Sequence, residues 1–316
     1  MNSKKEKEKE IFDLVYGQKN FNIEHEDKPD FWISNSNLKF GVEITELYHN
    51  ESSARIQNIE SYRTELLNDK NYRHKDDPKH IKVDNIDFLD KESGKLEFSQ
   101  DAIIQDLPSI IDYRNLLSEA IKEKTRKSKK YNSELKYYEL IINDVVGSLD
   151  LLGLDQFQRY LFSQEVIETI LDSNFEEIYL ISSLKSKKYF FPLKRMIFIS
   201  KVFLFNEISI KIYPPEKEIE DRIYYQDLSE FLYYEGFKDL KIYEKKSEIQ
   251  LIYANTGLKI TPENSCQLLL DDWYIKPYVS KLEKNSNKFI NNDNLKLIEK
   301  AKQDFFYYIN METEIT

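Results

Sequence analysis

The sequence has very little cysteine and glycine. Its 316 residues include one cysteine, Cys266, and seven glycines. A single cysteine excludes an intrachain disulfide and a zinc site built from several cysteines, and it suits a reducing compartment. We expect Cys266 to be a small buried apolar residue. The glycine-rich loops that cradle phosphates in P-loop and dinucleotide-binding proteins are absent, which excludes both classes.

Long apolar segments are also missing. No run of about 18 apolar residues occurs, so we expect no membrane-spanning helix. The N-terminal stretch MNSKKEKEKE is charged and is not followed by an apolar segment, so we expect no signal peptide. These absences predict a cytoplasmic protein that does not contact a membrane.

Apolar and charged residues are both abundant. Hydrophobic residues make up 41% of the chain and charged residues 32%, which predicts a folded protein with a sizeable core. The formal net charge of −10 argues against a protein that coats nucleic acid without specificity. It still permits an enzyme that binds metal through acidic residues and phosphate through a local basic surface.

Periodicity and turn residues predict a mixed α/β fold. We expect helices at 3–16, 52–70, 108–130, 154–173, 228–234 and 292–308. We expect strands at 31–34, 40–47, 81–89, 95–99, 137–143, 177–182, 247–253 and 258–261. The segment 196–213 is expected to be β-rich. We place a boundary near residue 195, between a core at 1–195 and a smaller α+β accessory region at 196–316.

Two acidic residues stand out on the expected hairpin. Asp30 begins the first strand, and Glu43 lies inside the second between Val42 and Ile44. Because strand side chains alternate, Glu43 shares a face with Thr45 and points away from its two aliphatic neighbours. A buried carboxylate is costly unless a cation neutralises it. Two of them on adjacent strands therefore predict a site for a hard metal ion such as Mg²⁺.

The segments KPDF at 28–31 and GVEIT at 41–45 resemble the metal-binding motif of the PD-(D/E)XK nuclease superfamily. The resemblance covers roughly the first 145 residues and reaches 195 if the later helix and strand complete the sheet. It implies a restriction-endonuclease-like α/β fold, in which helices flank a mixed sheet. It also implies hydrolysis of phosphodiester bonds.

The resemblance assigns metal ligands. It implies that Mg²⁺ or Mn²⁺ is bound by Asp30, Glu43 and the backbone carbonyl of Ile44. Members of the family often add a glutamate from the first helix, and here we favour Glu10 over Glu8.

One position departs from the family pattern. Thr45 stands where the family has a lysine, and it is retained as a site residue beside Asp30 and Glu43. The segment EAIKEKTRKSKKY at 119–131 resembles the I-x-x-K-x-x-K-x-x-x-Y pattern of uncharacterised bacterial relatives that share E-x-T. That likeness implies catalytic and nucleic-acid-binding roles for Lys124 and Lys127 and a nucleic-acid-binding role for Tyr131.

Helix spacing supports a role for this segment. Residues 122–130 include six basic residues and one acidic residue. Lys124 and Lys127 are three residues apart, so they share a helix face. Arg55 and Gln57, on the preceding expected helix, are weaker candidates for nucleic-acid binding.

Each assignment has a plainer alternative. Asp30 could be a turn residue, and Glu43 could pair with Lys39. The lysine-rich helix could be a solvated face, and Glu8 and Glu10 could be surface residues. His25 could touch a metal, but we interpret it as a loop histidine.

The sequence therefore predicts a Mg²⁺-dependent nuclease. We favour DNA as its substrate, with RNA as an alternative, and the class suggests a role in bacterial defence. A catalytically inactive binding or regulatory protein is one alternative function. Another is an effector that acts only with a partner. A homodimer or a protein partner fits the class.

Overall fold

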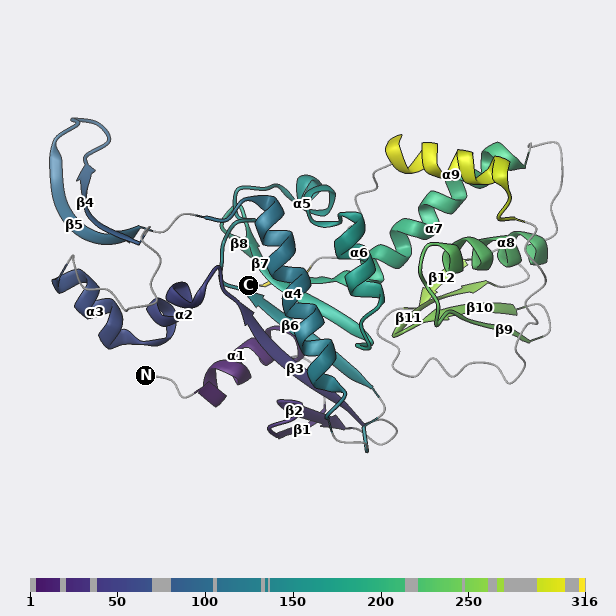
Figure 1. The fold of residues 1–316 in the computed structure, drawn as a ribbon, viewed down its shortest axis with the longest axis horizontal. Helices are drawn as coiled ribbons and strands as arrows, with labels where there is room; N and C mark the ends of the chain where they lie inside the picture. Colours follow the sequence, from purple (N-terminus) through teal and green to yellow (C-terminus); the bar gives the residue numbers. More distant parts are fainter. Residues whose placement is uncertain are drawn as a thin grey trace.

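The computed structural model describes most of the chain, namely residues 4–17, 21–34, 39–69, 81–104, 107–131, 134–135, 137–213, 221–245, 248–260, 266–269, 289–304 and 313–315. These residues form a seven-stranded mixed sheet, a four-stranded sheet and a two-stranded hairpin, together with helices (Figure 1). The expected mixed α/β class is confirmed. No helix in this described part is long and apolar enough to cross a membrane.

The seven-stranded sheet is the centre of the fold. Its order is β1 (Asn22–His25), β2 (Phe31–Ser34), β3 (Lys39–Leu47), β6 (Tyr138–Asp144), β7 (Glu177–Leu184), β8 (Lys187–Pro192) and β13 (Thr313–Glu314). Neighbours β3, β6 and β7 run parallel, and the other pairs are antiparallel. Strands β6 and β7 are buried along nearly their whole length, as their continuous apolar runs predict.

Helices cover both faces of this sheet. On one face α1 (Lys4–Tyr16) packs Phe12 and Tyr16 into a cluster with Phe31 and Phe40. On the other face α4 (Ile110–Ser128) buries Leu117 and its apolar neighbours, together with α5 (Leu154–Leu161) and α6 (Gln164–Leu171). Sequence periodicity predicted α1 and α4 correctly.

Two expected helices are each divided. The segment 52–70 forms α2 (Glu51–Asn58) and α3 (Glu60–Asn68), separated by Ile59, whose backbone is extended. The segment 154–173 forms α5 and α6, and Ser163 caps the second of these by accepting a hydrogen bond from the Val166 N–H. Such caps supply partners for N–H groups that a new helix leaves unpaired.

The expected β-rich segment at 196–213 is wrong, because α7 (Leu193–Ile212) occupies it. Successive helical residues are about 100° apart, and four in a row from Met196 to Ile199 are buried. The helix is thus covered on all sides at that point. Its sequence lacks a polar face, and β-branched and aromatic residues favour a strand in any sequence-based prediction. The boundary expected near 195 falls within the first turn of α7.

The C-terminal region packs on α7. It contains α8 (Asp221–Tyr234), an antiparallel sheet and α9 (Asn292–Asp304). The sheet order is β12 (Cys266–Leu269), β11 (Thr256–Ile260), β10 (Glu248–Tyr253) and β9 (Lys241–Lys245). The side chain of Cys266 lies outside the described residues.

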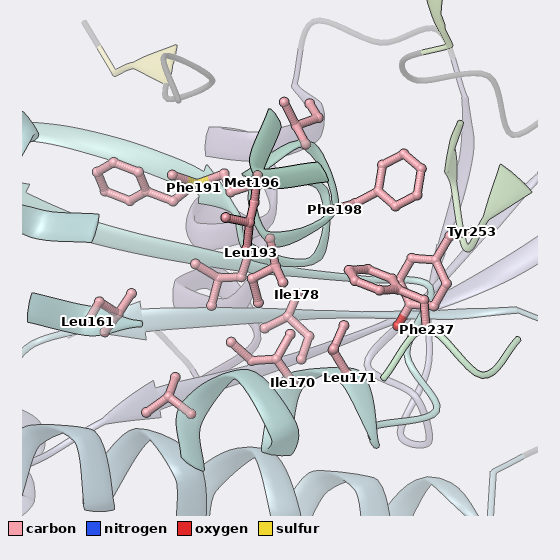
Figure 2. Close-up of a cluster of buried hydrophobic side chains, with 14 of the residues drawn as sticks. Leu161, Ile170, Leu171, Ile178, Phe191, Leu193, Met196, Phe198, Phe237 and Tyr253 are labelled. Carbon is pink, nitrogen blue, oxygen red and sulfur yellow. The ribbon is translucent and has the colours of Figure 1, made fainter. Parts of the chain in front are cut away.

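One apolar cluster joins this region to the central sheet. Figure 2 shows Ile178 of β7 and Leu171 of α6 grouped with Phe198, Phe237 and Tyr253. The core therefore continues through α7 into the C-terminal region.

A hairpin extends away from the body of the protein (Figure 1). It consists of β4 (Lys82–Leu89) and β5 (Leu96–Ile104), which confirms the two strands expected around the turn KESG. Helix α3 packs against β5, and Phe88 stacks on Phe98 with ring centroids 4.5 Å apart.

Candidate active site

A cavity of about 600 Å³ is lined by residues of α1, β3, α4 and the segment that precedes β2. Asp30 and Glu43 line this cavity and are buried, with 9% and 7% of their surface exposed. Thr45, Lys124 and Lys127 line the same cavity. The fold thus brings residues 80 positions apart in the sequence, such as Ile44 and Lys124, into one site.

The pairing of β2 with β3 positions the two acids. Phe31 pairs with Val42, so Asp30 and Glu43 are the next residues along the two antiparallel strands. The backbone N–H of Ile44 donates a hydrogen bond of 2.7 Å to Asp30 Oδ2. This hydrogen bond fixes Asp30 to the strand that carries Glu43. A residue that served only the turn after Pro29 would not need this bond.

Lys124 supplies a cation to the cavity. Its Nζ donates to Glu43 Oε1 at 2.6 Å and to the carbonyl of Ile44 at 3.2 Å. Lys39, the partner considered for Glu43 from the sequence, lies over the Trp32 ring instead, 4.0 Å from its centroid. The structure thus brings a lysine from α4 to the motif acid, although position 45 is a threonine.

Burial shapes the electrostatics of these groups. Burial, followed by the nearby charge of Glu43, raises the pKa of Asp30 from 3.8 to about 7. Burial and the charge of Glu43 also raise the pKa of Tyr131 above its usual value. The Tyr131 hydroxyl is buried and has no hydrogen-bond partner among the described residues. The negative charge in the cavity is thus incompletely compensated.

The donor atoms suit a hard cation. Two carboxylates and one carbonyl are oxygen ligands of the type that Mg²⁺ binds, usually with water completing the set. The Lys124 ammonium already contacts Glu43 and the Ile44 carbonyl, so these oxygens attract a positive charge in this structure. Within the described residues, no group of three or more acidic, histidine or cysteine side chains is arranged to hold a metal. The oxygen donors beside Lys124 are thus two carboxylates, Asp30 and Glu43, and the Ile44 carbonyl.

The first helix contributes Glu8 to the cavity rather than Glu10. Glu8 lines the cavity, pairs with Lys4 at 3.1 Å and lies 3.3 Å from His25 Nε2. Glu10 is exposed and does not line the cavity. His25 is the last residue of β1 and not a loop residue. The helical phase could have shown this, because Glu8 lies three residues before the buried Ile11.

The other nucleic-acid-binding candidates have different positions. Lys127 lies at the rim, is half exposed and pairs with Glu123 at 2.5 Å, while Tyr131 lines the cavity. Arg55 pairs with Glu51 at 3.2 Å, and neither Arg55 nor Gln57 lines the cavity.

Sequence reasoning missed a polar group on the α1 side of the cavity. It consists of Lys7, Glu46, Tyr48 and Asn58, all of which line the cavity. These residues come from α1, β3, the segment after β3 and α2. No local pattern links them, since the fold alone brings them together.

Comparison with known proteins does not identify the chain: no family model, no curated protein and no solved structure matches it.

Proposed function

We propose that the protein is a metal-dependent nuclease with a restriction-endonuclease-like core that hydrolyses phosphodiester bonds, with DNA as the favoured substrate. The observation that carries this proposal is the contact of Lys124 with Glu43 and with the Ile44 carbonyl, beside the buried Asp30. A hydrolytic site for phosphodiesters needs oxygen ligands for a cation and a positive group for the phosphate. Both are present in one cavity.

The arrangement of elements supports the proposal. Asp30 directly precedes β2 and Glu43 lies on β3, its antiparallel neighbour; helices cover both faces of the mixed sheet, and β6 runs parallel to β3. These features agree with what the resemblance at 28–31 and 41–45 implies. A cytoplasmic location, expected from the cysteine content and the N-terminal sequence, and a role in bacterial defence, suggested by the class, remain parts of the proposal.

The residues of the cavity have separable roles. A bound Mg²⁺ or Mn²⁺ would polarise a phosphate oxygen and lower the pKa of a water molecule. Asp30, Glu43 and the Ile44 carbonyl would hold that ion. Lys124 would stabilise negative charge that develops on the phosphate. Lys127 at the rim would attract the nucleic-acid backbone.

Cleavage assays test this proposal. The substrates are supercoiled plasmid, linear duplex, single-stranded DNA and RNA, with Mg²⁺ or Mn²⁺, and the proteins are wild type, Glu43→Gln and Lys5→Ala. Lys5 is an exposed lysine of α1 that does not line the cavity, so its variant is a matched surface control. We expect wild type and Lys5→Ala to cut at least one substrate, and EDTA or Glu43→Gln to abolish cutting.

Other outcomes point to the alternative functions. If the protein binds nucleic acid but neither cuts it nor binds metal, the result would favour an inactive binding or regulatory protein over a nuclease. Cutting that appears only when another protein is added would indicate an effector that needs a partner. Cutting that survives in Glu43→Gln would place the active site elsewhere.

A further inference from the structure

Lys7 is held in a defined position on the α1 side of the cavity. Its Nζ lies 2.9 Å from Glu46 Oε1, 2.9 Å from Asn58 Oδ1 and 3.4 Å from the Tyr48 hydroxyl. The partners also bond to one another: the Tyr48 hydroxyl donates to Glu46 at 2.7 Å, and Asn58 donates to Tyr48 at 2.9 Å. A lysine side chain with four rotatable bonds is thereby restricted to one place.

The network leaves part of the ammonium group available. An ammonium has three N–H donors. Two of them have acceptors at 2.9 Å, and the third donates to the Tyr48 hydroxyl at 3.4 Å, which is the longest of the three contacts. The Lys7 side chain is 37% exposed and lines the cavity. An anionic oxygen in the cavity can therefore take the third donor without breaking the two short contacts.

An ordinary surface ion pair does not require this arrangement. Lys9 on the same helix pairs with Asp13 at the surface, and a partly exposed pair of that kind contributes only about 0–1 kcal/mol. The Lys7 network instead recruits a tyrosine and an asparagine from two further segments. The network holds one lysine in a fixed position beside a cavity. Such an arrangement is typical of a group that binds a ligand.

We propose that Lys7 binds a second phosphate of the substrate strand, next to the phosphate that Lys124 contacts, and that Glu46, Tyr48 and Asn58 position it. The proposal rests on the nuclease function. It names the substrate class as an oligonucleotide with at least two phosphates in the cavity, as opposed to a mononucleotide. The volume of about 600 Å³ is in the usual range for a site that encloses a ligand of this size.

Binding measurements without metal test the proposal, because nothing is cut in EDTA. The affinities of wild type, Lys7→Ala and Lys5→Ala are measured for a fluorescent oligonucleotide by anisotropy at several salt concentrations. We expect Lys7→Ala to bind about tenfold more weakly, as the loss of one hydrogen bond to a charged group implies. The slope of log affinity against log salt concentration should fall by about 1. Lys5→Ala should match wild type within about twofold.

A mononucleotide and a stability measurement separate the explanations. The affinity for a nucleoside monophosphate should fall less in Lys7→Ala than the oligonucleotide affinity does, because its single phosphate can still bind at Lys124. A structural role for Lys7 predicts lower stability in urea with unchanged oligonucleotide affinity, and that result would overturn the proposal. Equal losses in Lys7→Ala and Lys5→Ala would overturn it too. If wild type binds no oligonucleotide in EDTA but cuts it with Mg²⁺, this proposal fails and the nuclease function stands; if it neither binds nor cuts, both fail.

Discussion

The protein buries two groups of charged side chains, and the two groups differ in how their charges are satisfied. In the first, Glu177 is fully buried and accepts hydrogen bonds from the backbone N–H groups of Ile178, Lys194 and Arg195. The last two belong to the first turn of α7, whose N–H groups have no partner within the helix. Lys194 Nζ donates to the carbonyls of Ser173 and Phe175. This group serves the fold.

The second group faces the cavity. Asp30 accepts one backbone N–H, and Glu43 and Lys124, which both line the cavity, contact each other. No residue of the first group lines that cavity. The contrast lies in the partners: backbone groups satisfy Glu177 and Lys194, while the cavity group leaves room for a ligand.

A shifted pKa does not separate the two groups. Burial lowers the pKa of Lys194 to about 8 and raises that of Glu177, just as burial raises the pKa of Asp30 to about 7. Shifted pKa values occur at structural sites as well as at functional ones. Access to a cavity, combined with oxygen donors that attract a cation, is the feature that points to function.

The largest expected effect is on the structural group. Glu177→Ala removes the partner of three backbone N–H groups and a negative charge that stabilises the buried Lys194 ammonium. We expect a loss of about 4 kcal/mol in the free energy of unfolding, or failure to fold. Urea denaturation measures this loss. A change below about 1 kcal/mol would remove the distinction between the two groups.

Lys124→Met tests the cavity group. It keeps most of the apolar stem and removes the charge beside Glu43. We expect cleavage to fall about 10²-fold and the free energy of unfolding to fall as well, but by less than in Glu177→Ala, because the partly buried Glu43 loses its ion-pair partner. Single-turnover kinetics and urea denaturation give the two values. Lys122→Met, an exposed lysine on the same helix, is the control and should leave both unchanged.

Asp30→Asn should stabilise the metal-free protein. The folded-state pKa of Asp30 is raised from 3.8 to about 7, so between these values the folded state binds more protons than the unfolded state. Stability in EDTA therefore falls as the pH rises through this range. Asparagine cannot ionise, and it can still accept the Ile44 N–H. We expect a gain of about 2 kcal/mol near pH 8 and little difference near pH 4.

Denaturation of both proteins at several pH values checks the Asp30 prediction. A variant that is less stable than wild type at the higher pH would mean that the Asp30 carboxylate is already compensated by the protein.

Tyr131→Phe should have the smallest effect. The hydroxyl is buried without a hydrogen-bond partner among the described residues, so its removal should raise stability by up to about 1 kcal/mol. Thermal denaturation in EDTA measures this. Lower stability would show that the hydroxyl has a partner in solution, and Glu43, which raises the pKa of Tyr131, is the candidate.

Local signals explain what the sequence could predict. Strand alternation placed Glu43 on the face opposite Val42 and Ile44, and the hairpin put Asp30 beside it. Helical spacing put Lys124 and Lys127 on one face. Each inference used residues close together in the chain, where geometry is nearly fixed by the type of element.

Contacts between distant segments explain what could not be predicted. That Lys124 reaches Glu43, rather than Lys39, depends on how α4 crosses the sheet. The Lys7 network joins residues of α1, β3 and α2. Helix α7 was mistaken for strands because burial on every side removes the polar face that marks a helix.

Titration with Mn²⁺ tests the central claim most directly, namely that the cavity group is an open cation site. Calorimetry would compare wild type, Glu43→Gln, Lys124→Met and Lys5→Ala. We predict one Mn²⁺ per wild-type or Lys5→Ala chain, and no binding by Glu43→Gln. Lys124→Met should bind more tightly, because its ammonium no longer competes for Glu43 and the Ile44 carbonyl. Absence of binding to wild type, or binding unchanged in Glu43→Gln, would contradict the account.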